Sequence, residues 1–136
     1  RGDEMTEKNT QLEAGLASDL NRELDALLPL AAKALGRELG TDGDFYILKQ
    51  KKPLVKDGDC YQWDSFEPYF KNNDAMKLAV DLRMSIYCAG VDKACATAYA
   101  NGHIEAYADF DDRPREVAIR MAILRCAAEI GKQISV

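Results

Sequence analysis

Residues 94–108 read ACATAYANGHIEAYA, two runs of small and β-forming residues separated by Asn101-Gly102. Asn-Gly is the strongest short hairpin signal, because both residues tolerate a positive φ. A preceding run, SIYCA at residues 85–89, is joined to them through a turn that contains Gly90 and Asp92. The three runs predict a three-stranded antiparallel meander with strands at 85–89, 94–100 and 103–108.

Helical patterns precede and follow this meander. Leucines and alanines recur at steps of three and four over residues 9–35, which predicts a long helix. Pro29 lies in its middle and removes a main-chain hydrogen bond, so we expect a kink there or two helices that meet. The last helix is predicted from Arg113 to about Lys132, with Pro114 in its first turn, where proline is tolerated.

The region between the long helix and the meander is predicted in four parts. Residues 36–44 hold three glycines and two aspartates and are expected to be loop. Residues 45–49 read as a strand, and residues 60–63 as a short hairpin partner after a turn at 57–59. An irregular aromatic stretch, 64–71, leads to a helix from about 72 to 83. Asn72, Asn73 or Asp74 is expected to cap this helix, and its apolar side is expected to carry Met76, Ala79, Val80 and Met84.

A meander flanked by helices indicates the α+β fold class, with an antiparallel sheet layered against helices. The chain has 136 residues, which suits one domain. We assign residues 1–18 to a tag remnant and a helical extension, with Met5 as the natural start. Residues 19–136 form a single domain.

Composition narrows the function classes. The net charge of −5 disfavours direct nucleic-acid binding, which needs lysine and arginine to displace phosphate counterions. No apolar run is long enough to span a membrane, and the N-terminus lacks the order of a signal peptide, so a cytoplasmic protein of the bacterial host cell is expected. The cysteines at 60, 88, 95 and 126 have apolar or aromatic neighbours and irregular spacing. They are expected to be core residues in a reducing compartment, with no metal site and no cofactor.

Three stretches carry a resemblance to a known family: residues 21–27 (NRELDAL), 73–80 (NDAMKLAV) and 118–132 (AIRMAILRCAAEIGK). Together they resemble the phage "ABA sandwich" domain proteins, small accessory proteins of phages and prophages. The resemblance covers about residues 19–132 and implies a helix–sheet–helix sandwich of phage or prophage origin. It implies no established activity and no catalytic residues. The chain departs from it in the extension at about 5–18 and in an insert around 42–62.

Five aromatic residues lie close together in a short region that has no extended helical or strand periodicity: Tyr61, Trp63, Phe66, Tyr69 and Phe70. Tyrosine and tryptophan are enriched in binding interfaces because they combine a large apolar area with a polar tip. We therefore predict a partner-binding surface here. The alternative is a hydrophobic cluster buried under a loop.

Four basic residues are candidates for contact with an anionic ligand: Arg120, Lys49, Lys51 and Lys52. Arg120 falls between two apolar flanks of the last helix, one turn after Glu116. The alternatives are a helical Glu116–Arg120 pair and lysines that guard a strand edge against other chains.

No catalytic motif is recognisable, and His103 is the only histidine available as a general base. Asp109, Asp111 and Asp112 lack the spacing of a calcium loop and are expected to favour the start of the last helix. We therefore expect a non-enzymatic phage or prophage accessory protein that binds a host protein, inhibiting a defence or regulatory component. The alternative is a nucleotide-sequestering protein with its ligand at a subunit interface. The leucine stripe between Leu12 and Leu28 favours a homo-oligomer.

Overall fold

The computed structural model describes residues 2–43, 45–50, 62–100 and 102–134. Three helices and two three-stranded antiparallel sheets follow one another in the order α1 (Gly2–Leu35), β1 (Leu39–Asp42), β2 (Phe45–Lys49), β3 (Trp63–Ser65), α2 (Asn72–Asp81), β4 (Ser85–Ala89), β5 (Lys93–Tyr99), β6 (His103–Asp109) and α3 (Arg115–Gln133). The α+β class, the meander and the helix at the N-terminus are thereby confirmed.

The second sheet is the predicted meander, with strand order β4-β5-β6. Its inner face is built largely from alanine, whose small side chains allow α3 to pack closely against β5 and β6. This face comprises Ala94, Ala96 and Ala98 of β5 with Ile104, Ala106 and Ala108 of β6. Gly102 has a φ of 133°, a conformation that residues with a side chain rarely adopt, and Asn101 lies outside the described residues.

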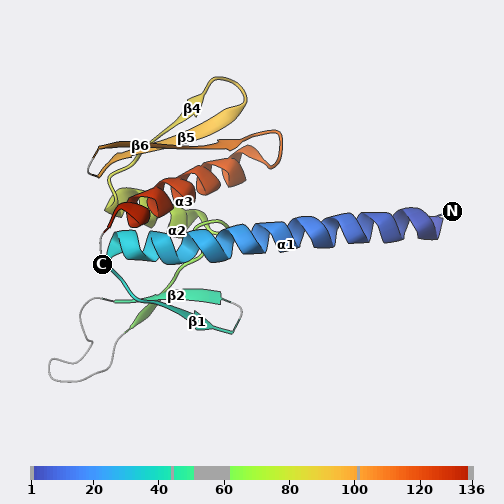
Figure 1. Cartoon of the computed structure of the whole chain (residues 1–136), viewed down its shortest axis with the longest axis horizontal. Helices are drawn as coiled ribbons and strands as arrows, with labels where there is room; N and C mark the ends of the chain where they lie inside the picture. The colour runs from blue at the N-terminus through green and yellow to red at the C-terminus, as the bar shows by residue number, and fades with distance from the viewer. Residues whose placement is uncertain (1, 44, 51–61, 101, 135–136) are drawn as a thin grey trace.

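The layers run sheet, helix, helix, sheet (Figure 1). The β4–β6 sheet covers α3, α3 packs against α1, and β2 lies on the other side of α1, where the Tyr46 hydroxyl donates a hydrogen bond to the Asp25 carboxylate. The order of the layers therefore differs from the helix–sheet–helix sandwich that the resemblance implies. The helices lie between two sheets, and the outer face of the meander carries exposed side chains.

The long first helix is unbroken at Pro29, so the expectation of two helices meeting there is wrong. Pro29 and Asp25, whose carbonyl loses its partner, are both exposed, and water can satisfy that carbonyl. The buried side of α1 faces α3 through Leu24, Leu28, Ala31 and Ala32. The N-terminal half of α1 projects beyond the other elements (Figure 1).

The expected loop at 36–44 contains β1, which pairs with β2. Its glycine has a packing role, because a Cβ built on Gly40 would lie 2.8 Å from Cζ3 of Trp63. The missing side chain leaves room for the indole, which reaches from β3 to β1. The predicted hairpin partner of β2 is observed, but as Trp63–Ser65, which includes the first two residues of the stretch expected to be irregular. The expected turn at 57–59 and the start of that strand at 60–61 lie outside the described residues.

Helix α2 is found where the sequence predicts it, and of its expected apolar side only Ala79 and Met84 pack into or against the core. Ala75, Leu78 and Ala79 pack into the core, whereas Met76 and Val80 are 61% and 65% exposed. The N-cap residue is Lys71, which makes no side-chain capping bond. Asp74, expected as a cap, is buried and accepts hydrogen bonds from the Ser65 hydroxyl at 2.8 Å and the Glu67 main chain at 2.9 Å. These tertiary bonds orient the helix.

Candidate functional site

The predicted aromatic surface is divided among three places. Trp63 is 40% exposed and lies against Gly40, on the opposite face of the first sheet from the buried Leu48. Phe66 is buried in the main hydrophobic core, and not in a separate cluster under a loop. Tyr69 and the exposed Phe70 form an edge-to-face pair with ring centroids 4.9 Å apart, in the turn before α2. Tyr61 lies outside the described residues.

Two of the predicted basic residues, Arg120 and Lys49, lie in the described ranges, and both have partners within the protein. Arg120 donates from Nε to the Tyr69 carbonyl and from Nη1 to Asn72 Oδ1, both at 2.6 Å, and so ties α3 to the start of α2. These partners take the place of the expected pair with Glu116. Lys49 Nζ lies 3.4 Å from the Glu38 carboxylate. Lys51 and Lys52 are outside the described ranges.

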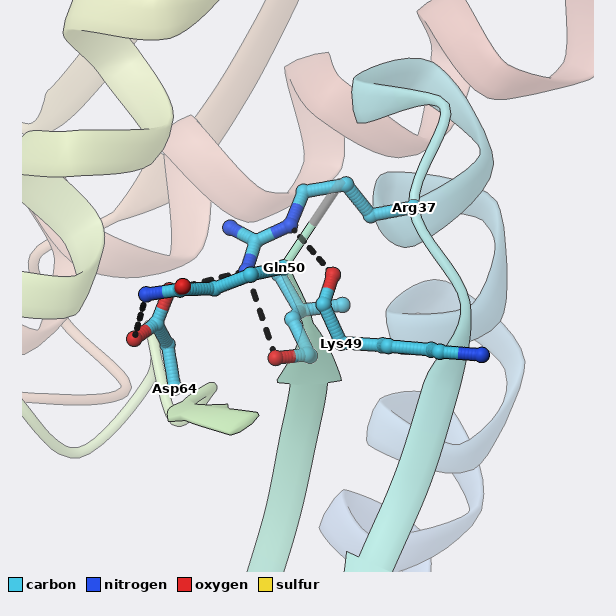
Figure 2. A network of polar contacts seen from close by, with 5 residues as sticks. Arg37, Lys49, Gln50 and Asp64 are labelled. Carbon is cyan, nitrogen blue, oxygen red and sulfur yellow. Dashed lines mark hydrogen bonds and ion pairs between the residues drawn. The ribbon is translucent and has the colours of Figure 1, made fainter. Parts of the chain in front are cut away.

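A polar network that the sequence analysis missed surrounds Arg37, between the end of α1 and the first sheet. Its guanidinium donates to the main-chain carbonyls of Lys49 (2.9 Å) and Leu48 (3.2 Å) and to Asp64 Oδ2 (2.8 Å). The Gln50 side chain donates to the other oxygen of the Asp64 carboxylate at 3.2 Å, and Figure 2 shows the guanidinium and the Gln50 amide converging on Asp64. An open cleft of about 700 Å³ lies beside the network.

The lining of this cleft includes Arg37, Asp64 and Asp81. The Asp64 carboxylate already neutralises the guanidinium, and Asp81 adds a further negative charge. The network therefore holds the first sheet to α1, and the cleft is a poor receptor for a phosphate group.

Strand β6 is an edge strand of the second sheet, and its outer edge pairs with no other described strand. At the two ends of the β5–β6 ladder, the Ala100 amide donates to the Gly102 carbonyl and the Phe110 amide donates to the Asp92 carbonyl. Hydrogen-bonded pairs alternate along the ladder, so the even-numbered residues of β6 are those that bond β5. In an antiparallel ladder the alternate residues direct their main-chain groups away from the partner strand. Those of His103, Glu105, Tyr107 and Asp109 therefore point away from the sheet.

We call the space beside this edge the β6 groove. It has a volume of about 670 Å³ and lies between β6 and the two long helices. Its lining consists of Glu23 and Leu27 of α1, residues 103–107 of β6, and Arg125, Glu129 and Gln133 of α3. Three carboxylates and one guanidinium give this lining a negative charge.

Arg125 closes one end of the edge. Its Nε and Nη2 donate to Glu23 Oε1 at 2.9 and 2.6 Å, and its Nη1 donates to the Tyr107 carbonyl at 2.8 Å. The last bond confirms that the Tyr107 carbonyl points out of the sheet. Arg125 thus links both helices to β6 and leaves the edge open from His103 to the Tyr107 amide.

Side chains on the outer face of β6 form a chain of hydrogen bonds. The Tyr107 hydroxyl donates to Glu105 Oε2 at 2.6 Å, and His103 Nε2 lies 2.9 Å from Glu105 Oε1. The bonds from Tyr107 and His103 lower the pKa of the Glu105 carboxyl, and the same carboxylate raises the pKa of the Tyr107 phenol. Both shifts move these two groups farther from neutral pH, so neither Glu105 nor Tyr107 gains a pKa suited to general acid–base work.

The other chemical candidates gain no support as sites. Cys95 and Cys126 are buried as expected, whereas Cys88 is exposed, and Cys60 is not among the described residues. Within the described ranges no group of three or more His, Cys, Asp or Glu side chains is placed to hold a metal ion. Asp109, Asp111 and Asp112 are all exposed. None of the helices, as far as they are described, is long and apolar enough to cross a membrane.

The alternation of polar or aromatic residues with small or aliphatic residues along β6 was a usable sequence signal for this site. It places His103, Glu105 and Tyr107 on one face and Ile104 and Ala106 on the other, as a half-buried strand requires. The helices that wall the groove are distant in sequence, so the groove itself had no local signal.

Comparison of the chain with protein-family models, with curated proteins and with solved structures finds no match. The case for a function therefore rests on the chemistry of the β6 groove.

Proposed function

We propose that this chain is a non-enzymatic phage or prophage accessory protein that binds a host protein by accepting an extended, basic segment of it at the free edge of β6. The observation that carries the proposal is the row of outward-directed main-chain groups from His103 to Tyr107, open to the β6 groove. The phage origin is supported by the sequence resemblance alone.

Strand addition suits this edge because main-chain hydrogen bonds supply affinity and alternate side chains supply specificity. The amides of His103, Glu105 and Tyr107 and the carbonyls of His103 and Glu105 are directed outward. About five residues of an incoming strand can pair with this length of edge, at roughly 3.3 Å per residue. Arg125 marks the end of the pairing, since it already occupies the Tyr107 carbonyl.

The walls favour a basic partner segment. The carboxylates of Glu23, Glu105 and Glu129 line the groove, and Arg125 is the only cation among the described residues of the lining. Leu27 and Ile104 add apolar surface that can contact alternate side chains of the segment. Complementary charge of this kind raises association rates and suppresses wrong partners more than it raises affinity.

The test is calorimetric titration with a synthetic peptide of alternating lysine and valine, about eight residues long, a little more than a typical strand. We expect saturable binding together with slower hydrogen exchange at the Glu105 amide. The same peptide, N-methylated at the residues that face β6, is expected to bind at least tenfold more weakly, and so is the glutamate–valine analogue. Equal affinity for all three peptides would rule out strand addition.

A pair of charge reversals provides the matched control. Glu129→Lys changes the wall of the groove, whereas Glu116→Lys makes the same change in charge at an exposed position on α3 that is outside the lining. Only the first is expected to weaken binding of the lysine peptide. Equal weakening by both variants would mean that overall charge, and not the groove, attracts the peptide.

A further inference from the structure

The opposite edge of the same sheet is also open. Because Ala94, Ala96 and Ala98 of β5 bond β6, the alternate residues of β5 bond β4 through Ser85, Tyr87 and Ala89. The main-chain groups of Ile86 and Cys88 therefore point away from the sheet. Strand β4 lies at the outer margin of the molecule (Figure 1).

The side chains of β4 do not protect this edge. Exposed strand edges are commonly guarded by lysine, proline or other charge, but the five residues of β4 carry none. Ile86 is 37% and Tyr87 47% exposed, Cys88 is exposed, and Val91 in the following turn is 90% exposed. An uncharged, partly apolar edge of this kind is a template for pairing with another strand.

The two ends of β4 carry opposite charges. Arg83 precedes the strand and Asp92 follows it, and both are exposed. We propose that β4 pairs with β4 of a second copy of this chain, antiparallel about Tyr87, to form a continuous six-stranded sheet. Antiparallel pairing places Arg83 of each copy at the end where Asp92 of the other copy lies. Parallel pairing would place like charges together at both ends.

The register follows from the direction of the main-chain groups. With Tyr87 on the twofold axis, Ile86 of one copy stands opposite Cys88 of the other, and both present outward amides and carbonyls. Their side chains share the α3 side of the sheet, so the two copies cover each other's apolar surface. Charged side chains of a partner would meet no opposite charge along the centre of this edge. A second copy presents the same uncharged residues there, and for this reason we take it as the occupant. Pairing through β4 leaves both β6 grooves free.

Sedimentation velocity across a concentration series tests the proposal. We expect a dimer for the wild-type chain and at least a tenfold weaker association for Ile86→Lys, which places a lysine on each side of the axis. Val80→Lys introduces the same residue at an exposed apolar position on α2 and is expected to leave the dimer intact. Circular dichroism confirms that each variant is folded. A monomeric wild-type chain at high concentration, or a folded Ile86→Lys dimer, would overturn the proposal.

Oxidative cross-linking tests the register separately. In a Cys60→Ser background, Ile86→Cys places a thiol opposite Cys88 of the second copy at a main-chain spacing compatible with a disulfide. We expect a covalent dimer from this variant and none from the background alone, since Cys88 then lacks a thiol partner across the axis. Cross-linking of the background through Cys88, or none with the added thiol, would overturn the register about Tyr87.

Discussion

The backbone of Gly131 in α3 lies against the main-chain carbonyl of Leu30 in α1: a Cβ built on Gly131 would stand 1.9 Å from the Leu30 oxygen. The first and last helices share the most extensive contact of any two described elements. This close approach depends on the absence of a side chain at one position.

Gly131→Ala is expected to destabilise the fold. In an unconstrained helix the same change stabilises by about 0.5–1 kcal/mol, because alanine loses less backbone entropy on folding. Here the new methyl group meets main-chain atoms that cannot rotate away, and overpacking typically costs about 1–3 kcal/mol. We therefore expect a loss of about 2 kcal/mol or more, measured by urea unfolding. Lys132→Ala, at an exposed neighbour in the same turn, is expected to stay within about 0.5 kcal/mol of wild type, as surface changes usually do. Stabilisation by Gly131→Ala would show that the helices are farther apart.

Gly40→Ala is expected to displace the indole of Trp63. The added Cβ would lie 2.8 Å from Cζ3, closer than van der Waals contact allows, and the ring must swing toward solvent. Trp63 is the only tryptophan in the chain, so intrinsic fluorescence reports its environment without ambiguity. We expect the emission to shift to longer wavelength, whereas Thr41→Ala, at the exposed neighbouring position of β1, should leave it unchanged. Unchanged emission in Gly40→Ala would contradict the indole's position across β1.

The Glu105 carboxyl is expected to titrate at a lower pH than an ordinary glutamate. Hydrogen bonds from Tyr107 and His103 favour the charged form and lower its pKa below that of an ordinary glutamate. A lowered pKa in the folded state means that this network adds stability above the unfolded-state value and loses it as the pH falls through the folded-state value. Carboxyl carbon NMR measures the pKa directly. Tyr107→Phe is expected to raise the pKa of Glu105 toward that of an ordinary glutamate, and no change would mean that the Tyr107 bond is absent in solution.

The Cys126 thiol is expected to resist alkylation in the folded protein. Burial raises its pKa to about 11. Between roughly pH 9 and 11 the unfolded chain ionises this thiol while the folded chain does not, so stability falls as the pH rises through that window. Mass spectrometry after treatment with iodoacetamide at pH 8 should find Cys88 modified and Cys126 protected until denaturant is added. Equal labelling of the two cysteines under native conditions would contradict the buried position of Cys126.

The sequence by itself determined the elements whose signals are local. The meander over 85–108 followed from strand-length runs and turn residues, and α3 followed from a helical period that begins after Pro114. These elements form because neighbouring residues favour the same backbone conformation, so no contact with a distant residue is needed to determine it. The part of the candidate site on β6 was predictable for the same reason.

Only the tertiary structure decided the rest, because each remaining choice depended on a residue far away in sequence. Gly40 belongs to a strand because Trp63 lies across it, and α2 turns Asp74 inward because Ser65 and the Glu67 amide meet its carboxylate. Glu23, 102 positions before Arg125, holds that arginine against the strand edge at the end of the β6 groove. Periodicity reports which residues share a face, but contacts across the whole chain decide what that face packs against.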